Sequence, residues 1–297
     1  METRFLQTFL IVVETGSLAE TARRLNITPS AVVQRIKALE GEIGSSLVSR
    51  AGHAMRPTAA GEAIVDSARA IVVSSISMPN LAAGELDVGE LRLGAISSAL
   101  TGVLPSLLVA LKANRPKIDL YIVPGTSADL YERVTKGELD AAVIVEPHFK
   151  MPKSLEWLPI REEPLVLLTP AKMRKADPRL ILQREPFIRY DRNHWGGRLA
   201  DRFLRKLKIV PHEQLELDSL EAISVLVDRG LGVSLIPDWA PPWPDGLQVS
   251  KWPIEGAPIR RIGLLWPQVS AKLRLMRSLK DEMAQLIKGS SRVGESR

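Results

Sequence analysis

The sequence predicts a small N-terminal unit made mainly of helices, a long connecting helix, and a larger C-terminal part of the α/β class. Three observations lead to this prediction. Two short amphipathic stretches meet at "LNITPS" near the N-terminus, with no room for a loop between them. A further run with helical spacing begins at Thr58. From residue 89 onward, short apolar runs alternate with helical patterns, as in βαβ units.

Composition restricts the class of protein. The 297 residues suffice for two or three compact units. The absence of cysteine excludes disulfides, thiolate metal sites, cysteine nucleophiles and thiol-based redox sensing. The four histidines lack metal-ligand spacing and no nucleotide-binding glycine motif occurs, so we expect no metal and no cofactor. The first apolar run is too short for a secretion signal and no run could span a membrane, so a cytoplasmic location is expected.

The net charge of +6 does not by itself predict nucleic-acid binding, because it is unevenly distributed. Residues 1–87 hold 8 Lys and Arg against 9 Asp and Glu, a net charge of −1. Residues 88–297 hold 32 against 25, a net charge of +7. A prediction of DNA binding therefore has to rest on where individual basic side chains lie.

The joint between the two amphipathic stretches is marked by helix-capping residues. Ser17 begins a helix and has Glu20 three residues on, which is the spacing of a capping box. Asn26 suits a left-handed residue at the end of that helix. Thr28 is a good N-cap for the next helix, and Pro29 fits its first position. Two helices joined by so short a turn indicate a helix-turn-helix, whose second helix fits the major groove of DNA.

The second helix has one apolar face and one polar face, which is why we expect it to read DNA. The side chains expected at DNA from this helix are Thr28, Pro29, Ser30, Val33, Gln34, Arg35 and Lys37. Arg50 and Arg56, with His53, flank a glycine turn typical of a small hairpin wing beside the groove. The alternatives are a plain helical hairpin in a bundle and an exposed basic hairpin.

Thr58 caps a long helix with an apolar stripe, formed by Ala63, Ala68, Ile71 and Val72. A stripe with few partners inside so small a unit predicts a dimer seam. A dimer would place two reading helices on half-sites one or more helical turns apart.

The larger part predicts two α/β lobes with parallel strands and a cleft between them. Ligands in such folds lie where strands end and helices begin. The candidate ligand-binding residues are Ser97, Ser98, Thr101, Thr126, Arg189, Tyr190, Trp195 and Ser219. Hydroxyls at helix starts, faced by Arg189 or Arg192, favour a small acid as ligand. The alternatives are hydroxyls that only cap helices, arginines that pair with Asp191 or Asp201, and an uncharged aromatic ligand held by Tyr190 or Trp195.

The stretch from Leu6 to Gly61 resembles the winged helix-turn-helix of LysR-type transcriptional regulators. The pieces that match are "F…V.E.GS…TA..LN.T.SAV..RI.ALE…G..L..R" and "R-P-T-A-A-G". The resemblance implies a two-lobed effector domain like the periplasmic solute-binding proteins. It also implies double-stranded DNA, a small-molecule effector, RNA polymerase and the chain itself as partners, the last as a dimer or a dimer of dimers. Three residues depart from the family pattern: Val48, where looser packing under the wing is expected, Val33, and Pro79, where a break or kink of the helix is expected.

These expectations combine into a division of the chain. We expect a DNA-binding unit over residues 1–58, a linker helix over 59–88, an effector domain over 89–289 and a disordered tail over 290–297. Lobe I is expected at about 89–161 and 258–289, and lobe II at about 162–257. The rival interpretation is an α/β enzyme, or a solute-binding protein with a helical N-terminal extension. No catalytic motif supports an enzyme, and a solute-binding protein would need a secretion signal.

Overall fold

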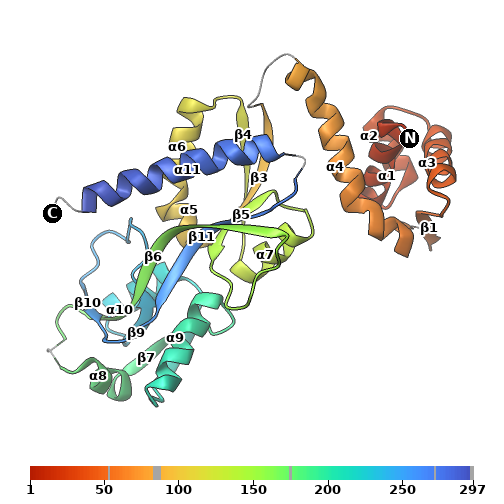
Figure 1. Ribbon diagram of the computed structural model, residues 1–297. Helices are drawn as coiled ribbons and strands as arrows, with labels where there is room; N and C mark the ends of the chain where they lie inside the picture. The colour runs from red at the N-terminus through yellow and green to blue at the C-terminus, as the bar shows by residue number, and fades with distance from the viewer. Residues whose placement is uncertain (53, 83–87, 174–175, 271, 295–297) are drawn as a thin grey trace. The chain divides into compact units, whose positions relative to one another are not determined.

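The computed structural model describes the chain except for residues 53, 83–87, 174–175, 271 and 295–297 (Figure 1). Its contacts divide the chain into two compact units. One unit comprises Met1–Val88 with Val269–Leu273, and the other comprises Gly89–Gln268 with Arg274–Arg297. Among the described residues, no helix has the length and apolar character needed to cross a membrane.

The smaller unit is a helix-turn-helix with a wing. Its elements are α1 (Thr3–Thr15), α2 (Leu18–Leu25), α3 (Pro29–Ile43), β1 (Val48–Ala51), β2 (Ala54–Pro57) and α4 (Ala59–Ala82). One core holds them together, formed by Leu6, Phe9, Val12, Ala22, Val32, Ile36, Leu39, Leu47, Val48 and Ala68. Val48 is 8% exposed, so the shorter side chain at this position is still buried beneath the wing.

The turn between α2 and α3 has the capping geometry that the sequence predicts. Thr28 Oγ1 accepts a hydrogen bond from the backbone N–H of Ala31 at 3.2 Å, and Asn26 adopts a left-handed conformation with φ 51°. Ser17 Oγ accepts one from the N–H of Glu20 at 3.3 Å. The carboxylate of Glu20 pairs with Arg23, so only half of the predicted capping box forms.

The start of α4 is tied to the wing. Thr58 Oγ1 accepts from the N–H of Gly61 at 3.0 Å and donates to the carbonyl oxygen of Ser46 at 2.6 Å. A Cβ at Gly61 would overlap the carbonyl oxygen of Leu47, so glycine is required where the chain enters α4. The expected break at Pro79 is wrong, because α4 remains helical to Ala82. Pro79 lies in the last turn of α4, where its missing N–H removes one backbone hydrogen bond and leaves the hydrogen bonds of the earlier turns in place.

The larger unit contains a mixed sheet, in which the expected parallel strands are accompanied by antiparallel ones. Its strands are β3 (Gly89–Ala95), β4 (Ile118–Pro124), β5 (Ala141–Val145), β6 (Leu155–Pro170), β9 (Ser234–Pro237), β10 (Val249–Pro253) and β11 (Ile259–Pro267). The order is β10-β6-β11-β5-β3-β4, with β9 also paired to β6. Strands β3, β4 and β5 are parallel, whereas β6 and β11 are antiparallel because β6 leaves the first half of the unit and β11 returns to it.

Helices cover both faces of this sheet. They are α5 (Ser97–Gly102), α6 (Leu104–Asn114), α7 (Ser127–Thr135) and α11 (Leu273–Gly294). Because β4 and β5 lie on opposite sides of β3, right-handed crossovers place α6 and α7 on opposite faces. Helix α11 lies beside α6 (Figure 1), where Asn114 donates to Glu282 at 3.0 Å. It continues to Gly294, and residues 295–297 lie outside the described part. The tail expected over residues 290–297 stays a prediction.

A second set of elements packs on separate cores. It comprises α8 (Pro178–Arg184), β7 (Pro186–Tyr190), α9 (Trp195–Lys206), β8 (His212–Leu217) and α10 (Leu220–Asp228), together with β9 and β10. Strands β7 and β8 are parallel, and Phe187 bridges to Val233 beside β9. We use "lobe I" for the part around β3, β4 and β5 and "lobe II" for the part around β7, β8 and β9. The limits expected from the sequence stay a proposal.

Candidate functional site

Helix α3 presents an exposed polar stripe in the smaller unit. Ser30, Gln34 and Lys37 are exposed, and their spacing places them on one side of the helix. The opposite side is buried against α1 and α2. Thr28 and Pro29 are exposed at the N-terminus of the helix, where backbone N–H groups favour a phosphate. Helix α3 is therefore packed against its own unit on one side and exposed to solvent on the other.

Two of the residues expected at DNA are less accessible. Val33 and Arg35 are only partly exposed. Arg35 Nη1 makes a long hydrogen bond of 3.4 Å to Thr8 Oγ1 on α1. The guanidinium of Arg35 therefore braces α3 against α1 in this structure.

The wing is a two-stranded hairpin with an exposed arginine on each strand. Arg50 pairs across the hairpin with Met55, and Arg56 pairs with Ser49. Since side chains alternate along a strand, Arg50 and Arg56 point to opposite faces of the hairpin. Arg50 Nε also donates to the carbonyl oxygen of Gly52 at 3.3 Å. His53, at the tip, lies outside the described residues.

The stripe expected to form a dimer seam is only partly available. Ala68 is 2% exposed and Val72 is partly buried, and both pack into the core of their own unit. Their predicted place in the dimer seam is therefore corrected. Apolar spacing alone does not show whether a residue faces a partner chain or the core of its own unit. Ala63 and Ile71 are exposed on α4, and Met78 is exposed further along it. At about 100° per residue these three lie within an arc of about 80°.

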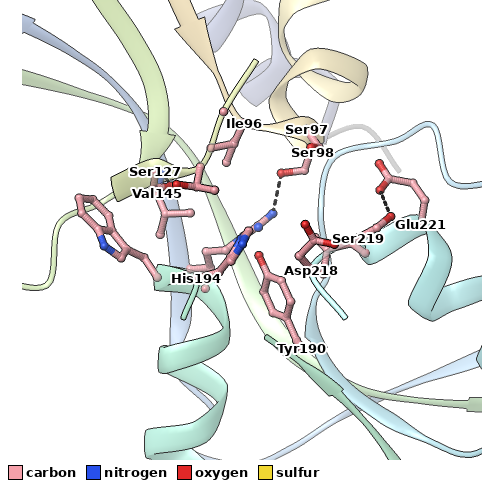
Figure 2. A pocket seen from close by; sticks show the side chains of 16 residues that line it. Ile96, Ser97, Ser98, Ser127, Val145, Tyr190, His194, Asp218, Ser219 and Glu221 are labelled. Atoms are coloured by element: carbon pink, nitrogen blue, oxygen red, sulfur yellow. Dashed lines mark hydrogen bonds between the residues drawn. The ribbon is translucent and has the colours of Figure 1, made fainter. Parts of the chain in front are cut away.

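The larger unit contains a cavity of about 80 Å³ between lobe I and lobe II. Lobe I contributes the ends of β3 and β4 and the starts of α5 and α7, and lobe II contributes the starts of α9 and α10 (Figure 2). Six of the predicted effector residues line it: Ser97, Ser98, Thr126, Tyr190, Trp195 and Ser219. The prediction missed Arg260, whereas His194, Asp218 and Glu221, which also line the cavity, lie in the two lobe II segments that were expected at the ligand. Thr101 does not line the cavity.

The two arginines expected to hold an acid are engaged elsewhere, which corrects that part of the prediction. Arg189 has a 5% exposed side chain, donates to Asp201 Oδ1 at 2.9 Å and pairs with Glu213. Arg192 donates to Glu216 at 2.9 Å and to Glu213 at 2.6 Å. These hydrogen bonds hold the pKa of Glu213 and of Glu216 below the usual value. Neither arginine lines the cavity, because strand pairing of β7 with β8 brings the glutamates to them.

Arg260 is the arginine that reaches the cavity. It is 1% exposed on β11, and its guanidinium donates to Glu163 on β6 and to Ser98 Oγ at 3.1 Å (Figure 2). Glu163 is 2% exposed and also accepts a hydrogen bond from the N–H of Ala240 at 3.1 Å. The buried carboxylate of Glu163 thus compensates the charge of Arg260. The hydrogen bond from Arg260 orients the Ser98 hydroxyl at the wall of the cavity.

Tyr190 and Gly196 fit closely beside this arginine. Tyr190 is 6% exposed, and burial raises the pKa of its phenol while the charge of Arg260 opposes that shift. The phenol therefore remains protonated at neutral pH. A Cβ at Gly196 would lie 3.0 Å from the Tyr190 hydroxyl oxygen and 3.3 Å from Arg260 Cδ. Glycine at the start of α9 thus lets Tyr190 and Arg260 lie against that helix end.

Trp195, which lines the cavity, belongs to an aromatic cluster that joins the two lobes. Trp195 of α9 packs edge-on against His148 and Phe149, with ring centroids 5.8 and 5.7 Å apart. Tyr131 of α7 lies 5.9 Å from the same indole. Burial lowers the pKa of His148, and the charges of Arg202 and Arg198 lower it further. Trp195 therefore contacts both the cavity and the aromatic residues that join the lobes.

Comparison with known proteins defines the class to which this fold and these surfaces belong. The model for "LysR substrate binding domain" matches residues 84–287, and that for "Bacterial regulatory helix-turn-helix protein, lysR family" matches residues 3–62. The chain therefore belongs to the LysR family of DNA-binding transcriptional regulators, with an effector-binding domain. It is a regulator and not an enzyme.

Relatives of known name support this membership over nearly the whole chain. A "Probable hydrogen peroxide-inducible genes activator" of Mycobacterium leprae is 30% identical, covering 95% of this chain and 93% of the relative. The "Probable HTH-type transcriptional regulator LrrA" of Synechococcus elongatus is 29% identical, covering 94% and 97%. Since this chain has no cysteine, a thiol-based response to peroxide is excluded for it, whatever the first relative does.

Solved structures share the fold at lower identity. A full-length OxyR variant from Pseudomonas aeruginosa has a TM-score of 0.70 at 24% identity, covering 95% of this chain and 94% of its own. LysG of Corynebacterium glutamicum, described with the bound effector Arg, has a TM-score of 0.67 at 22% identity, covering 96% and 99%. Full-length CbnR in complex with its target DNA has a TM-score of 0.59 at 24% identity, covering 95% and 100%.

Proposed function

We propose that the protein recognises a specific DNA site through the exposed stripe of α3 and the wing. The observation that carries this proposal is the stripe of Ser30, Gln34 and Lys37 on a helix held from behind by α1 and α2. Gln34 has the chemistry to pair with an adenine edge in the major groove. Arg50 and the N-terminus of α3 suit phosphates. The solved complex of CbnR with its target DNA supports the use of this fold on DNA.

We further propose that a small effector with an anionic group binds in the cavity between the lobes and changes DNA binding. Helix starts at Ser97, Ser127 and Trp195 converge there, and their N–H groups and dipoles favour negative charge. LysG, described with a bound effector, supports a small molecule as the signal. An effector shifts DNA binding only as far as its affinity differs between the two arrangements of the protein.

Self-association completes the proposal. A dimer through α4, or a dimer of dimers, would give the two reading helices that a pseudo-palindromic site requires. A cytoplasmic location and a contact with RNA polymerase follow from the family resemblance.

Replacing Gln34 by alanine tests how α3 docks. Gln34→Ala is expected to weaken binding to the specific site by about 1–3 kcal/mol and to relax base preference at one position, because one base contact is lost. Arg50→Ala is expected to weaken binding to all DNA sequences alike and to lower the salt dependence of binding, because a phosphate contact is lost. The measurement is fluorescence anisotropy on specific and scrambled duplexes at several salt concentrations. Gln183→Ala, an exposed glutamine on α8, is the matched control. Unchanged affinity and an unchanged footprint for Gln34→Ala would contradict the proposed docking of α3 in the major groove.

Replacing Ile71 by aspartate tests the dimer seam. Ile71 is 40% exposed on α4, and a carboxylate there would be buried without a partner in a dimer. Ile71→Asp is expected to give a monomer that loses DNA binding at micromolar concentration while the larger unit stays folded. Light scattering measures the mass, with Leu180→Asp on α8, 42% exposed, as control. A wild-type monomer at this concentration would contradict the proposal.

A further inference from the structure

The charges around the cavity specify more than an anionic ligand. Three side chains of charged residue types line it: Arg260, Asp218 and Glu221. Glu163 already compensates Arg260 through a buried ion pair. Ser219 Oγ donates to Glu221 Oε2 at 3.2 Å, which leaves the negative charge of Glu221 uncompensated. Asp218 is exposed, and among the described residues its side chain has no hydrogen-bond or ion-pair partner. The lining thus carries two negative charges that no cation of the described chain offsets.

These two carboxylates lie together on one side of the cavity. Figure 2 shows Asp218 and Glu221 beside Ser219 at the start of α10, across from Ser127 and Val145. A ligand that carried only negative charge would have to enter against both carboxylates. A ligand with a positive group at Asp218 and Glu221 would compensate them.

The other side of the cavity still favours negative charge. The start of α9 has no side-chain cap, since His194 makes no such hydrogen bond, and Gly196 in its first turn adds no Cβ. A ligand oxygen can therefore accept from the first N–H groups of α9, the role that a capping side chain usually has. The Tyr190 hydroxyl and the side chain of Arg260 lie next to this helix end, and Arg260 donates to Ser98 Oγ.

We infer that the effector is a small zwitterion of the amino-acid class. Its carboxylate lies at the start of α9 beside Ser98 and Arg260, and its ammonium group lies at Asp218 and Glu221. A volume of about 80 Å³ is smaller than the roughly 150 Å³ cavity that admits benzene. In this arrangement of the lobes the volume therefore favours a small ligand. The inference rests on the proposal that the cavity binds an effector, and it specifies the chemistry of that effector.

The test uses matched sets of three compounds on the full-length protein. Each set has an amino acid, the acid without its amino group and the amine without its carboxyl group, for example alanine, propionate and ethylamine. Glycine, alanine and serine head a panel of the proteinogenic amino acids. Thermal shift finds the ligand, and calorimetry measures its Kd. We expect at least one amino acid to bind while its acid and amine bind at least tenfold more weakly.

Variants locate the ammonium group. Asp218→Asn and Glu221→Gln are each expected to raise the Kd of that amino acid at least tenfold, and Asp245→Asn, an exposed carboxylate elsewhere in lobe II, to leave it unchanged. Ser98→Ala is expected to raise it as well. Equal binding by the acid or the amine alone, or unchanged Kd in both carboxylate variants, would overturn the zwitterion and leave the effector site standing. No binding by any compound of the three kinds would overturn the effector site itself.

Discussion

Arg260→Met is expected to lower the free energy of unfolding of the larger unit by about 3–5 kcal/mol, because Glu163 would be left buried with only the 41% exposed Arg161 as ion-pair partner. All six tryptophans lie in the larger unit, so tryptophan fluorescence during urea denaturation follows that unit alone. The double variant Arg260→Met with Glu163→Leu is expected to recover most of the loss, because it removes both charges together.

The chain supplies a matched control at the next position. Strands β6 and β11 align Arg260 with Glu163 and Arg261 with Glu162, so two arginine–glutamate pairs of the same chemistry lie side by side. Arg261 and Glu162 are 48% and 58% exposed, and Nε of Arg261 lies 2.9 Å from Glu162 Oε1. Arg261→Met is expected to lower the free energy of unfolding much less than Arg260→Met, because water screens an exposed pair. Equal losses from Arg260→Met and Arg261→Met would show that burial of the first pair does not determine its effect.

Arg189→Met is expected to lower the free energy of unfolding by about 3 kcal/mol at neutral pH. The variant leaves Asp201 and Glu213 without their buried partner, and the estimate takes the low end of the range because Glu213 is 35% exposed. Tryptophan fluorescence in urea again gives the measurement. Full stability in Arg189→Met, with a changed response to acidic ligands, would contradict a structural role.

The same variant has a defined pH dependence. The hydrogen bond from Arg189 is the main reason that the pKa of Glu213 is below its usual value. A carboxyl group whose pKa is lower in the folded protein stabilises it above the unfolded pKa, about 4.3, and loses that contribution as pH falls through the folded pKa. The stability difference between wild type and Arg189→Met is therefore expected to be largest near pH 7 and to narrow below about pH 4.3. A difference that stays constant down to pH 3 would exclude Glu213 as its source.

The turn of the helix-turn-helix could be predicted because its signals are local. Ser17, Asn26 and Thr28 act on backbone groups within a few residues, and each has the capping geometry that its type favours. The hydroxyl-bearing helix starts at Ser98 and Ser219 were predictable for the same reason.

The ion pairs could not be predicted in this way because their partners are distant in the sequence. Arg189 was expected to face a ligand, and Asp201 was foreseen only as an alternative partner, whereas Glu213 comes from a separate strand 24 residues away. Arg260 was missed because Glu163 is 97 residues away. One signal could have found it: "EE" and "RR" each occupy adjacent positions in strands, and alternation forces one member of each pair inward.

The dimer stripe shows a limit of periodicity. Helical spacing identified an apolar pattern on α4 correctly, but Ala68 and Val72 face the core of their own unit and Ile71 faces outward. Spacing predicts on which face of the helix a residue lies, but not what packs against that face. The structure was needed to separate the residues that face the core from those that face outward.

The central claim, that this chain reads a specific DNA sequence with paired α3 helices, is tested most directly by selection from fragmented genomic DNA. The purified full-length protein is incubated with short fragments at physiological salt, and the retained fragments are sequenced. The account predicts an enriched pseudo-palindromic motif with half-sites about 10 base pairs, or a multiple of that, apart. It also predicts that the enriched site binds at least about 10³-fold more tightly than random DNA of the same length. Retained fragments without a shared motif, or equal affinity for random DNA at the same salt concentration, would contradict it.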